Sequence, residues 1–338
     1  MNLSADAIQP VVSLSSILHP IDADMKELDR VIKTSLSSDV ALINQISQYL
    51  IEAGGKRIRP ALLFLISNAL SNQKSIAHRH EIAAVLEFIH TATLLHDDVV
   101  DESNLRRGRK TANAVFGNAA SVLVGDFLYS RAFQMMVVPG ELKIMEILSS
   151  ATNIIAEGEV LQLLNLNDPL VTEERYYKVI LYKTAKLFEA SAELGAVLAK
   201  ASTSQTLAAA EFGQHIGVVF QLIDDWLDYA AQSSVLGKNA GDDLREGKPT
   251  MPLIYLLNEG TAAQKDMAAC AIEQIEDCDE GFFNEVLNAV KTSGALEYTL
   301  SQAHLKAEQA KNCLTHFPDN ANTQALYQIC DYSLSRSF

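Results

Sequence analysis

The sequence predicts an all-α protein, a single-domain bundle of long helices around a central cavity. Two observations lead to this prediction. The 338 residues include only 16 glycines and 8 prolines, whereas the helix-favouring residues Ala, Leu, Glu and Gln are plentiful. In addition, apolar residues recur at spacings of three and four over long stretches, and the alternation typical of strands is nearly absent.

Five long helices are predicted from this periodicity, at residues 79–101, 112–137, 141–167, 173–200 and 204–230. Thr172 precedes Glu173 and Glu174, which is the pattern of an N-cap at the start of the fourth helix. Helices of roughly 20–28 residues are about 30–40 Å long at 1.5 Å per residue. Several are apolar on more than one face, so we expect them to occupy central positions in the bundle.

No change of composition and no long Pro/Gly/Ser linker divides the chain. We therefore predict one domain over residues 1–338, in which residues 1–23 form a flexible N-terminal segment. The formal net charge of −15 argues against nucleic acid as a partner, because binding to a phosphate backbone usually leaves a basic footprint. Two basic clusters, at residues 56–59 and 106–110, suggest a small anionic ligand instead, although solvated loop charge is the alternative.

The sequence also predicts a cytoplasmic protein. Its four cysteines lie in the last quarter of the chain without a Cys-x-x-Cys pair, which is typical of free thiols in a reducing compartment. Residues 1–30 mix charged residues among short apolar runs, unlike a signal peptide. The longest apolar runs are too short to span a bilayer, so no transmembrane segment is predicted.

Three aspartates, Asp97, Asp98 and Asp101, follow an apolar stretch of the first long helix. At these spacings all three carboxylates are expected to share one face of the helix. Like charges so placed repel one another, and a bound cation would offset that repulsion. Carboxylate oxygens are the ligands that Mg²⁺ prefers, and Mg²⁺ typically shares them with phosphates. For this motif alone, a solvated helix end is an equally good interpretation.

A second cluster repeats the spacing with Asp224, Asp225 and Asp228, again at the end of an apolar helix. Two such clusters are hard to explain as solvated surface. If the two helices lie side by side, the clusters oppose each other across a cleft that would hold several Mg²⁺ ions and clamp one diphosphate.

Basic residues accompany both clusters. Arg106 and Arg107 follow the first, and Lys238 and Lys248 follow the second within a glycine-containing segment, residues 237–250. A third basic element at residues 54–60 contains Lys56 and Arg59. Glycines allow a close backbone turn, and guanidinium groups match phosphate oxygens with two hydrogen bonds.

Taken together, these residues resemble the trans-isoprenyl (polyprenyl) diphosphate synthase family, and within it the bacterial octaprenyl diphosphate synthases. The resemblance runs from about Asn44 to Leu257 and is weaker beyond it. Its motifs are Gly54–Pro60, Leu94–Arg107, Gly125–Met136, Glu157–Leu163, Lys183-Thr184, Phe220–Asp228 and Gly237–Thr250. The family often has a basic residue near its C-terminus, but the end of this chain gives no reason to assign Arg336 a role.

The resemblance implies the fold, the ligands and the site residues. It implies a homodimeric all-α enzyme. Each active site would bind two substrates, isopentenyl diphosphate and an allylic diphosphate, together with three Mg²⁺ ions. The implied metal ligands are Asp97, Asp101 and Asp224, with Asp98, Asp225 and Asp228 binding directly or supporting them. The implied allylic-diphosphate contacts are Arg106, Lys183 and Lys238. Those for isopentenyl diphosphate are Lys56, Arg59, His90 and Arg107. Thr184 and Gln221 would line the reacting centre, and Lys248 would close a loop over it.

The reaction implied is ionisation of the allylic carbon–oxygen bond, attack by the double bond of isopentenyl diphosphate and loss of a proton. The expected product is a long all-trans polyprenyl diphosphate near C40, made from farnesyl diphosphate for quinone side chains. It would be held inside the protein or released by transient contact with a membrane.

Product length is predicted from the residues before the first aspartate motif. Ala92 lies five residues before Asp97, about 7.5 Å along a helix axis. Short-chain relatives often carry a bulky aromatic residue there, whereas Ala92 and Thr93 would let the growing chain pass. Further along, we expect Phe133, Met136 and Leu148 to line the wall of a closed tunnel, although ordinary core packing is the alternative for each of them.

Other functions remain possible on the sequence alone. A short-chain farnesyl or geranylgeranyl diphosphate synthase would share the same chemistry and differ in tunnel depth. A terpene cyclase would normally have a different second metal motif, with Asn and Ser or Thr. A non-catalytic subunit of a heteromeric synthase would tend to lose aspartates, and none is missing here. Binding of a basic protein by the acidic runs is the remaining alternative.

Overall fold

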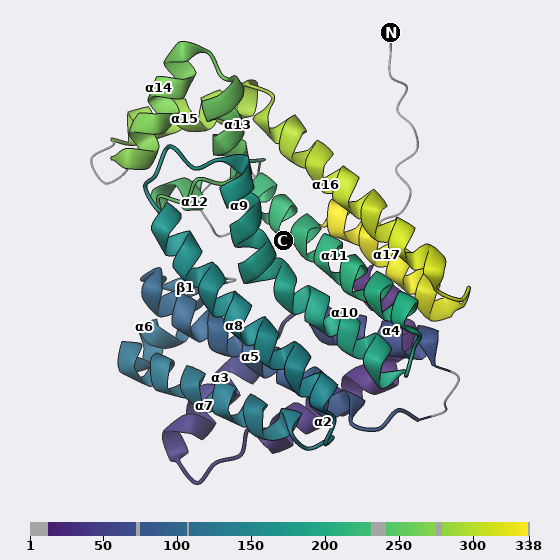
Figure 1. The fold of residues 1–338 in the computed structure, drawn as a ribbon. Helices are drawn as coiled ribbons and strands as arrows, with labels where there is room; N and C mark the ends of the chain where they lie inside the picture. Colours follow the sequence, from purple (N-terminus) through teal and green to yellow (C-terminus); the bar gives the residue numbers. More distant parts are fainter. Residues whose placement is uncertain (1–12, 72–74, 107, 231–240, 275–278, 337–338) are drawn as a thin grey trace.

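The computed structural model of the protein describes residues 13–71, 75–106, 108–230, 241–274 and 279–336 (Figure 1). Helices account for nearly all the regular structure of these residues. The exception is a hairpin of two short strands, β1 (Leu105–Arg106) and β2 (Arg109–Lys110), paired antiparallel. The prediction of an all-α bundle is therefore confirmed.

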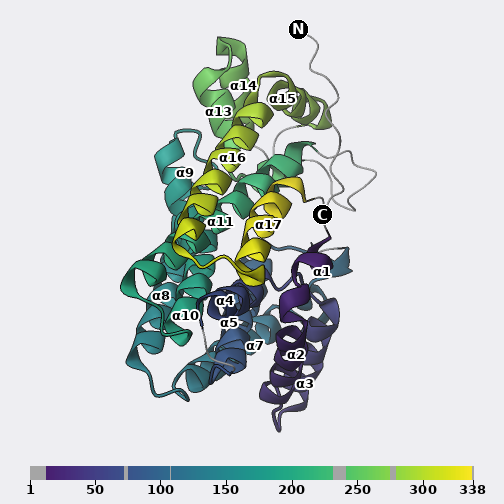
Figure 2. The same cartoon turned by 90° about the vertical axis from the view of Figure 1, so that its right-hand side faces the viewer.

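The N-terminal half of the bundle contains α1 (Leu14–Ile17), α2 (Asp22–Ser35), α3 (Ala41–Ala53), α4 (Ile58–Leu70), α5 (Arg79–Val100), α6 (Ala112–Phe116), α7 (Asn118–Met136) and α8 (Leu142–Asn165). A short 3₁₀ turn, η1 (His19–Ile21), joins α1 to α2. Helix α5 packs along α7 and also contacts α4 and α2. In Figure 2, α2 and α3 lie together on one flank of the molecule.

The C-terminal half contains α9 (Glu173–Ile180), the π-helical segment η2 (Leu181–Ala185), α10 (Lys186–Leu198), α11 (Thr203–Ala230), α12 (Asp242–Arg245), α13 (Met251–Glu259), α14 (Ala262–Glu273), α15 (Glu280–Thr292), α16 (Ala295–Cys313), η4 (Leu314–His316) and α17 (Ala321–Ser335). Helix α11 lies between α10 and α16, and α13, α14 and α15 gather at one end of the molecule (Figure 1).

The predicted helices occur, but two of them are not regular throughout. Thr172 caps α9 as predicted, because its side chain accepts the backbone N–H of Arg175 at 3.2 Å. The helix predicted at 112–137 is broken at Gly117, whose φ of +86° is incompatible with a continuous α-helix. The helix predicted at 173–200 runs through, with η2 as a local widening in its middle.

The segment at residues 13–23 differs from the flexible N-terminal segment that was predicted for residues 1–23. It is helical, and both Ile17 and Ile21 are buried in the main core. Apolar burial of this kind offsets the entropy lost on ordering the chain, so the segment packs rather than remaining free. Residues 1–12 lie outside the described residues.

A buried ionic cluster ties α2 to α4 and α5. Asp24 on α2 is buried, and Arg79 and His80 approach its Oδ1 at 2.5 and 3.0 Å. Asn68 on α4 donates to its Oδ2 at 3.2 Å. Burial alone would raise the pKa of Asp24, but the hydrogen bond from His80 and the charge of Arg79 outweigh it and lower the pKa.

This cluster predicts a pH-dependent loss of stability on substitution. Asp24→Asn should lower the free energy of unfolding at pH 7 by about 1.5–3 kcal/mol, the range for hydrogen bonds to charged groups. Because the folded-state pKa lies below the ordinary value, the contribution of the carboxylate is present above that value and is lost as pH falls through the folded pKa. Urea denaturation of the parent and the variant from pH 8 down to pH 3 measures this difference in the free energy of unfolding.

The control is Asp22→Asn, since Asp22 is a largely exposed neighbour on the same helix. It should change stability little. An Asp24→Asn variant as stable as the parent at pH 7 would contradict the assigned role of this cluster.

Candidate active site

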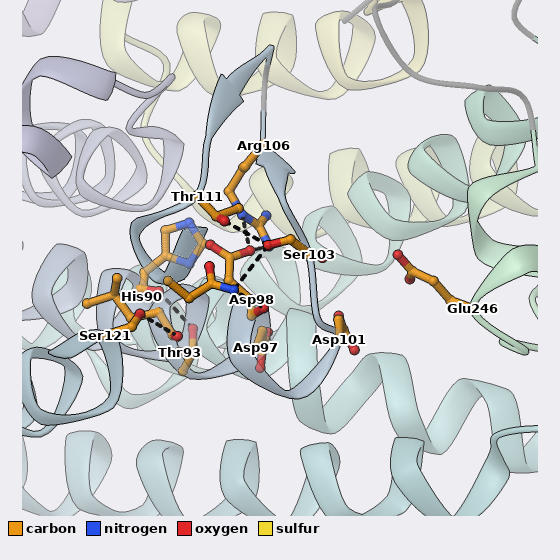
Figure 3. Close-up of polar contacts among 12 residues, drawn as sticks. His90, Thr93, Asp97, Asp98, Asp101, Ser103, Arg106, Thr111, Ser121 and Glu246 are labelled. Carbon is orange, nitrogen blue, oxygen red and sulfur yellow. Dashed lines mark hydrogen bonds and ion pairs between the residues drawn. The ribbon is translucent and has the colours of Figure 1, made fainter. Parts of the chain in front are cut away.

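The first aspartate motif closes α5, and its three carboxylates do not share one face. Asp97 and Asp101, one helical turn apart, line a cavity together with side chains of α8. Asp98 is turned toward Arg106 of the β1–β2 hairpin, as Figure 3 shows. The expectation that all three share a face is therefore wrong, because one residue of offset rotates a side chain by about 100° around a helix with 3.6 residues per turn.

Asp98 serves to hold the hairpin onto α5. It is only 4% exposed, and Arg106 approaches its Oδ1 through Nε at 2.8 Å and Nη2 at 2.7 Å. Burial raises the pKa of Asp98, while the Arg106 guanidinium acts in the opposite direction. The backbone carbonyl of Asp98 also accepts a hydrogen bond from the Asn113 side chain. Arg106 is thereby fixed at the rim of the site.

The second motif, at the end of α11, divides its aspartates in the same way. Asp224 is exposed, whereas Asp225 is fully buried. The phenol of Tyr176 donates to Oδ2 of Asp225 at 2.6 Å, and the amide of Gln221 donates to its Oδ1 at 2.8 Å. Burial, and then the neighbouring charge of Asp243, raises the pKa of Asp225 to about 8.

Asp228, the last aspartate of the second motif, holds the following segment. Its two carboxylate oxygens accept the backbone N–H groups of Asp242 and Asp243, each at 3.1 Å. These N–H groups open the short helix α12, whose first turn has no side-chain cap of its own. Asp228 therefore fixes the start of the segment that carries Lys248.

The π-helical segment η2 bridges the two motifs. Lys183 lies 2.5 Å from Glu159 and 3.4 Å from Asp97 of the first motif. The next residue, Thr184, donates to Oε1 of Gln221 at 2.9 Å, one turn before the second motif. Isolated π-helical turns are frequent at functional sites because they shift side chains relative to a regular helix.

Two glycines allow η2 to lie this close to its neighbours. A Cβ at Gly158 of α8 would come within 2.6 Å of the backbone nitrogen of Lys183, and a Cβ at Gly217 of α11 within 2.5 Å of the Cα of Ala185. Any larger residue at either position would push the bridge away from the motifs. The glycines thus determine how closely Lys183 and Thr184 approach both sets of aspartates.

Each aspartate that is turned toward the site is paired with a cation. Besides Lys183 at Asp97, Lys248 lies 2.9 Å from Asp101 and 2.6 Å from Glu246. Arg336 lies 2.7 Å from Asp224. Burial alone would lower the pKa of Lys248, but Glu246 and Asp101 outweigh it and raise the pKa well above its usual range.

These pairs bear on how well the site suits a divalent cation. Within the described residues, no group of three His, Cys, Asp or Glu side chains is already assembled as a metal site. The donors themselves are suitable, because Asp97, Asp101 and Asp224 offer hard carboxylate oxygens that are held by exchangeable lysine and arginine contacts. The carboxylates thus fit Mg²⁺ by their chemistry.

A cavity of about 590 Å³ extends from the first motif between α5, α7 and α8. Its volume lies within the range of small-ligand pockets. Its lining residues are Thr93, His96, Asp97, Val100, Asp101, Tyr129, Thr152, Asn153, Ile155, Ala156, Glu159, Val160, Gln162, Leu163, Leu166 and Lys183. The charged residues gather toward the motif, and apolar residues of α8 form much of the remaining wall.

The predicted chain-length residues have different positions relative to this cavity. Thr93 lines it, whereas Ala92 is fully buried in the main core. Met136 and Leu148 are buried in the same core. Phe133 is 43% exposed and is not among the lining residues, so its position does not support a role in the wall.

Of the residues predicted to bind isopentenyl diphosphate, Arg59 belongs to a stack that reaches the C-terminus. Its guanidinium lies 4.4 Å from the ring centroid of Phe188, and the Phe188 and Phe220 rings are 5.1 Å apart. Arg336 lies over the other partner, 4.4 Å from the Phe220 ring. Two arginines from opposite ends of the chain are thus joined through two aromatic rings.

Two further residues predicted to bind isopentenyl diphosphate are among the described residues. Lys56 is exposed in the loop before α4, and His90 is partly buried on α5. Arg107 and Lys238 lie outside the described residues.

Sequence reasoning missed three residues of this site. Arg336 was assigned no role, yet it meets Asp224. Glu159 lay inside a recognised motif without an assignment, yet it pairs with Lys183, and burial raises its pKa to about 7. Tyr176 was not singled out at all. Only Glu159 offered a sequence feature that could have revealed it, namely its place within the recognised motif Glu157–Leu163.

Comparison with known proteins agrees with this geometry. The family described as polyprenyl synthetase matches residues 40–332. This chain belongs to the polyprenyl synthetase family. It is 50% identical over 313 residues to the octaprenyl diphosphate synthase of Escherichia coli strain K12, covering 93% of this chain and 96% of that protein. It is 42% identical to an all-trans-nonaprenyl-diphosphate synthase of Rhodobacter capsulatus, covering 95% and 97%.

Solved structures of polyprenyl synthetases share the fold. The polyprenyl synthase of Caulobacter crescentus, crystallised with calcium and isoprenyl diphosphate, has a TM-score of 0.90 at 41% identity and covers 97% of this chain and 99% of its own. A decaprenyl diphosphate synthase from Rhodobacter capsulatus has a TM-score of 0.89 at 39% identity, with 95% and 98% covered. The predicted family, its fold and a long-chain prenyltransferase activity are confirmed.

The position of the aspartates predicts a large effect on turnover without loss of fold. Asp97→Ala and Asp224→Ala should each reduce prenyl transfer by about 10²–10³ or more, the usual cost of losing one preorganised electrostatic contact. The fold should persist, because neither Asp97 nor Asp224 belongs to the buried core. Steady-state rates and thermal denaturation of the same samples measure both. Glu146→Ala, an exposed substitution on α8, is the matched control. Near-normal turnover of either aspartate variant would refute the assignment.

Proposed function

We propose that the chain is a Mg²⁺-dependent synthase that adds isopentenyl diphosphate units to an allylic diphosphate. The starter is farnesyl diphosphate, and the product is an all-trans polyprenyl diphosphate near C40 that supplies quinone side chains. One observation carries the proposal. Cation-paired carboxylates from α5 line a cavity of about 590 Å³ whose lining surface is otherwise largely apolar. This combination suits a ligand with an anionic head and a long apolar tail.

Three Mg²⁺ ions would be held by Asp97, Asp101 and Asp224, and when bound they supply positive charge for the departing pyrophosphate. Two supports for this proposal are the donor chemistry of the carboxylates and the calcium in the structure of the Caulobacter crescentus relative. Asp98, Asp225 and Asp228 act by holding the hairpin, the Gln221 amide and α12 in place.

The basic residues bind and orient the diphosphates. Lys183 and Lys248 now lie on aspartates, and each exchanges that partner for phosphate oxygens when a diphosphate enters. Arg106, fixed by Asp98, contributes from the hairpin, and Lys238 is assigned to the same allylic diphosphate. Lys56, Arg59, His90 and Arg107 hold isopentenyl diphosphate. Arg336 joins this second group, since the aromatic stack connects it to Arg59.

At the reacting centre, Thr184 and Gln221 face the allylic carbon as its carbon–oxygen bond breaks. The double bond of isopentenyl diphosphate attacks this carbon, and a new carbon–carbon bond forms. The proton released from the adjacent carbon passes to a pyrophosphate oxygen, which regenerates an allylic diphosphate longer by one unit. Water must be excluded throughout, because it would capture the cation.

A homodimer is proposed on the basis of the surface of α7 and α8. Large apolar side chains are exposed along these helices and the turn between them, namely Leu123, Val137, Val138, Leu142 and Leu164. An exposed apolar face of this extent is typical of a subunit interface. A second copy of the chain is the occupant that the family resemblance implies.

A cytoplasmic location is proposed from the thiols, since Cys270, Cys313 and Cys330 are free. Among the described helices, none has both the length and the apolar character needed to cross a membrane. Release of so apolar a product would involve transient contact of the enzyme with a membrane surface.

The proposal is tested by incubating the purified protein with farnesyl diphosphate, isopentenyl diphosphate and Mg²⁺ and measuring product length. We expect products that accumulate near C40 and no turnover when Mg²⁺ is chelated. Main products of C15–C20 would instead indicate a short-chain synthase. Full turnover without a divalent cation would contradict the metal assignment.

A substitution in the cavity lining should shorten the product. Thr93→Phe places an aromatic ring in the cavity lining, so the chain should stop at roughly C15–C20 while the first condensation continues. Ala92→Phe, one residue away, is the matched comparison. It places the same ring in the core and should mainly destabilise, by about 1–3 kcal/mol. Products of unchanged length from Thr93→Phe would show that the tail does not pass this residue.

A further inference from the structure

A buried chain of hydrogen bonds connects the reacting centre to α9. The hydroxyl of Thr184 donates to Oε1 of Gln221 at 2.9 Å, and Nε2 of Gln221 donates to Oδ1 of Asp225 at 2.8 Å. The phenol of Tyr176 then donates to Oδ2 of Asp225 at 2.6 Å. Tyr176 and Asp225 are both buried, so this end of the chain is closed to solvent.

This chain determines which end of the Gln221 amide faces the reacting centre. An amide group has one oxygen, which accepts, and one NH₂ group, which donates. Oδ1 of Asp225 accepts from the NH₂ group of Gln221, and its Oδ2 is occupied by the phenol of Tyr176. The carbonyl oxygen of Gln221 is therefore turned toward Thr184 and the space beyond it.

The orientation matters because of the charge that develops on the allylic carbon. The oxygen is the negative end of the amide dipole, and a fixed dipole aimed at developing positive charge stabilises a transition state. An amide in the reversed orientation would turn its NH₂ group toward the allylic carbon. The positive end of its dipole would then disfavour ionisation of the allylic carbon–oxygen bond. Asp225 is buried with both carboxylate oxygens engaged, so its contribution is to orient this amide rather than to contact a ligand directly.

We propose that Tyr176 is a positioning residue for prenyl transfer, acting through Asp225 to hold the carbonyl oxygen of Gln221 toward the allylic carbon. The inference rests on the proposed function. Without the phenol, one oxygen of Asp225 loses its donor inside the protein, and a buried acceptor without a partner is costly. The side chain of Asp225 would then be free to shift, and the amide would no longer be held in one orientation.

The neighbouring residue provides a matched control. Tyr177 lies beside Tyr176 on α9, and its ring is 5.6 Å from that of Tyr176. Its buried hydroxyl has no hydrogen-bond partner among the residues that the structure describes. Tyr176→Phe and Tyr177→Phe therefore remove the same atom from adjacent positions, but only the first removal breaks the chain to Gln221.

The test is a double-mutant cycle on the full-length protein with both substrates and saturating Mg²⁺. Tyr176→Phe should lower kcat about tenfold or more, less than the about 10²–10³ for losing a direct contact, while both KM values stay within about twofold. Tyr177→Phe should leave kcat unchanged. Gln221→Leu should lower kcat, and adding Tyr176→Phe to it should cause no further fall, because both changes remove the same interaction.

Three outcomes would overturn the inference. The first is an unchanged kcat in folded Tyr176→Phe. The second is a fall that is additive with Gln221→Leu, which would mean that the phenol acts by another route. The third is a Tyr176→Phe variant that needs a higher Mg²⁺ concentration for half-maximal activity but reaches the parent kcat at saturating Mg²⁺, which would assign the phenol to the metal site.

Two further measurements keep the test decisive. If Tyr176→Phe does not fold, Asp225→Asn replaces it in the cycle, since an asparagine can donate to Gln221 and so reverse the amide. The same non-additivity with Gln221→Leu is expected, and additive losses would again refute the inference. An inactive parent enzyme would overturn the proposed function and this inference together, whereas an active parent with a normal Tyr176→Phe would overturn the inference alone.

Discussion

The architecture of the site depends on charge balance between aspartates and cations that are far apart in the sequence. Asp97, Asp101 and Asp224 meet Lys183, Lys248 and Arg336, and these three cations come from η2, the loop after α12 and the end of α17. Like charges one turn apart disfavour a helix end. The opposite charges that relieve this repulsion also join the α5 and α11 ends to three other parts of the bundle.

The same requirement explains why each aspartate motif contains two kinds of residue. Asp98 and Asp225 face inward and hold Arg106 and Gln221, whereas their neighbours face the site. Burying a carboxylate is costly unless it is fully hydrogen-bonded. Each inward aspartate is accordingly met by strong donors, and these contacts give the exposed carboxylates a rigid support.

Much of the fold and part of the candidate site could be predicted from the sequence. The helices follow from apolar spacing, and the two motifs are recognisable because their residues are adjacent in the chain. The direction in which each aspartate side chain points could not be predicted, since it depends on partners such as Arg106 and Tyr176 from other elements. Which of Ala92 and Thr93 lines the cavity could not be predicted for a related reason, because adjacent helical residues point about 100° apart and the rotation of α5 is set by packing. Arg336 was missed because nothing local distinguishes a terminal arginine that folds back from one in solvent.

The paired resting state also has a consequence for the order of events. With Lys183 and Lys248 on Asp97 and Asp101, each of these two carboxylates already has a cationic partner. A lone anion would have to draw a lysine away from its carboxylate, and a lone divalent cation would have to displace that lysine. When the anion and the divalent cation arrive together, the lysines can move to the phosphate oxygens while the carboxylates bind the metal. Every charged group then keeps a partner of opposite charge. The protein thus admits its ionic ligands as a combination and discriminates against either one alone.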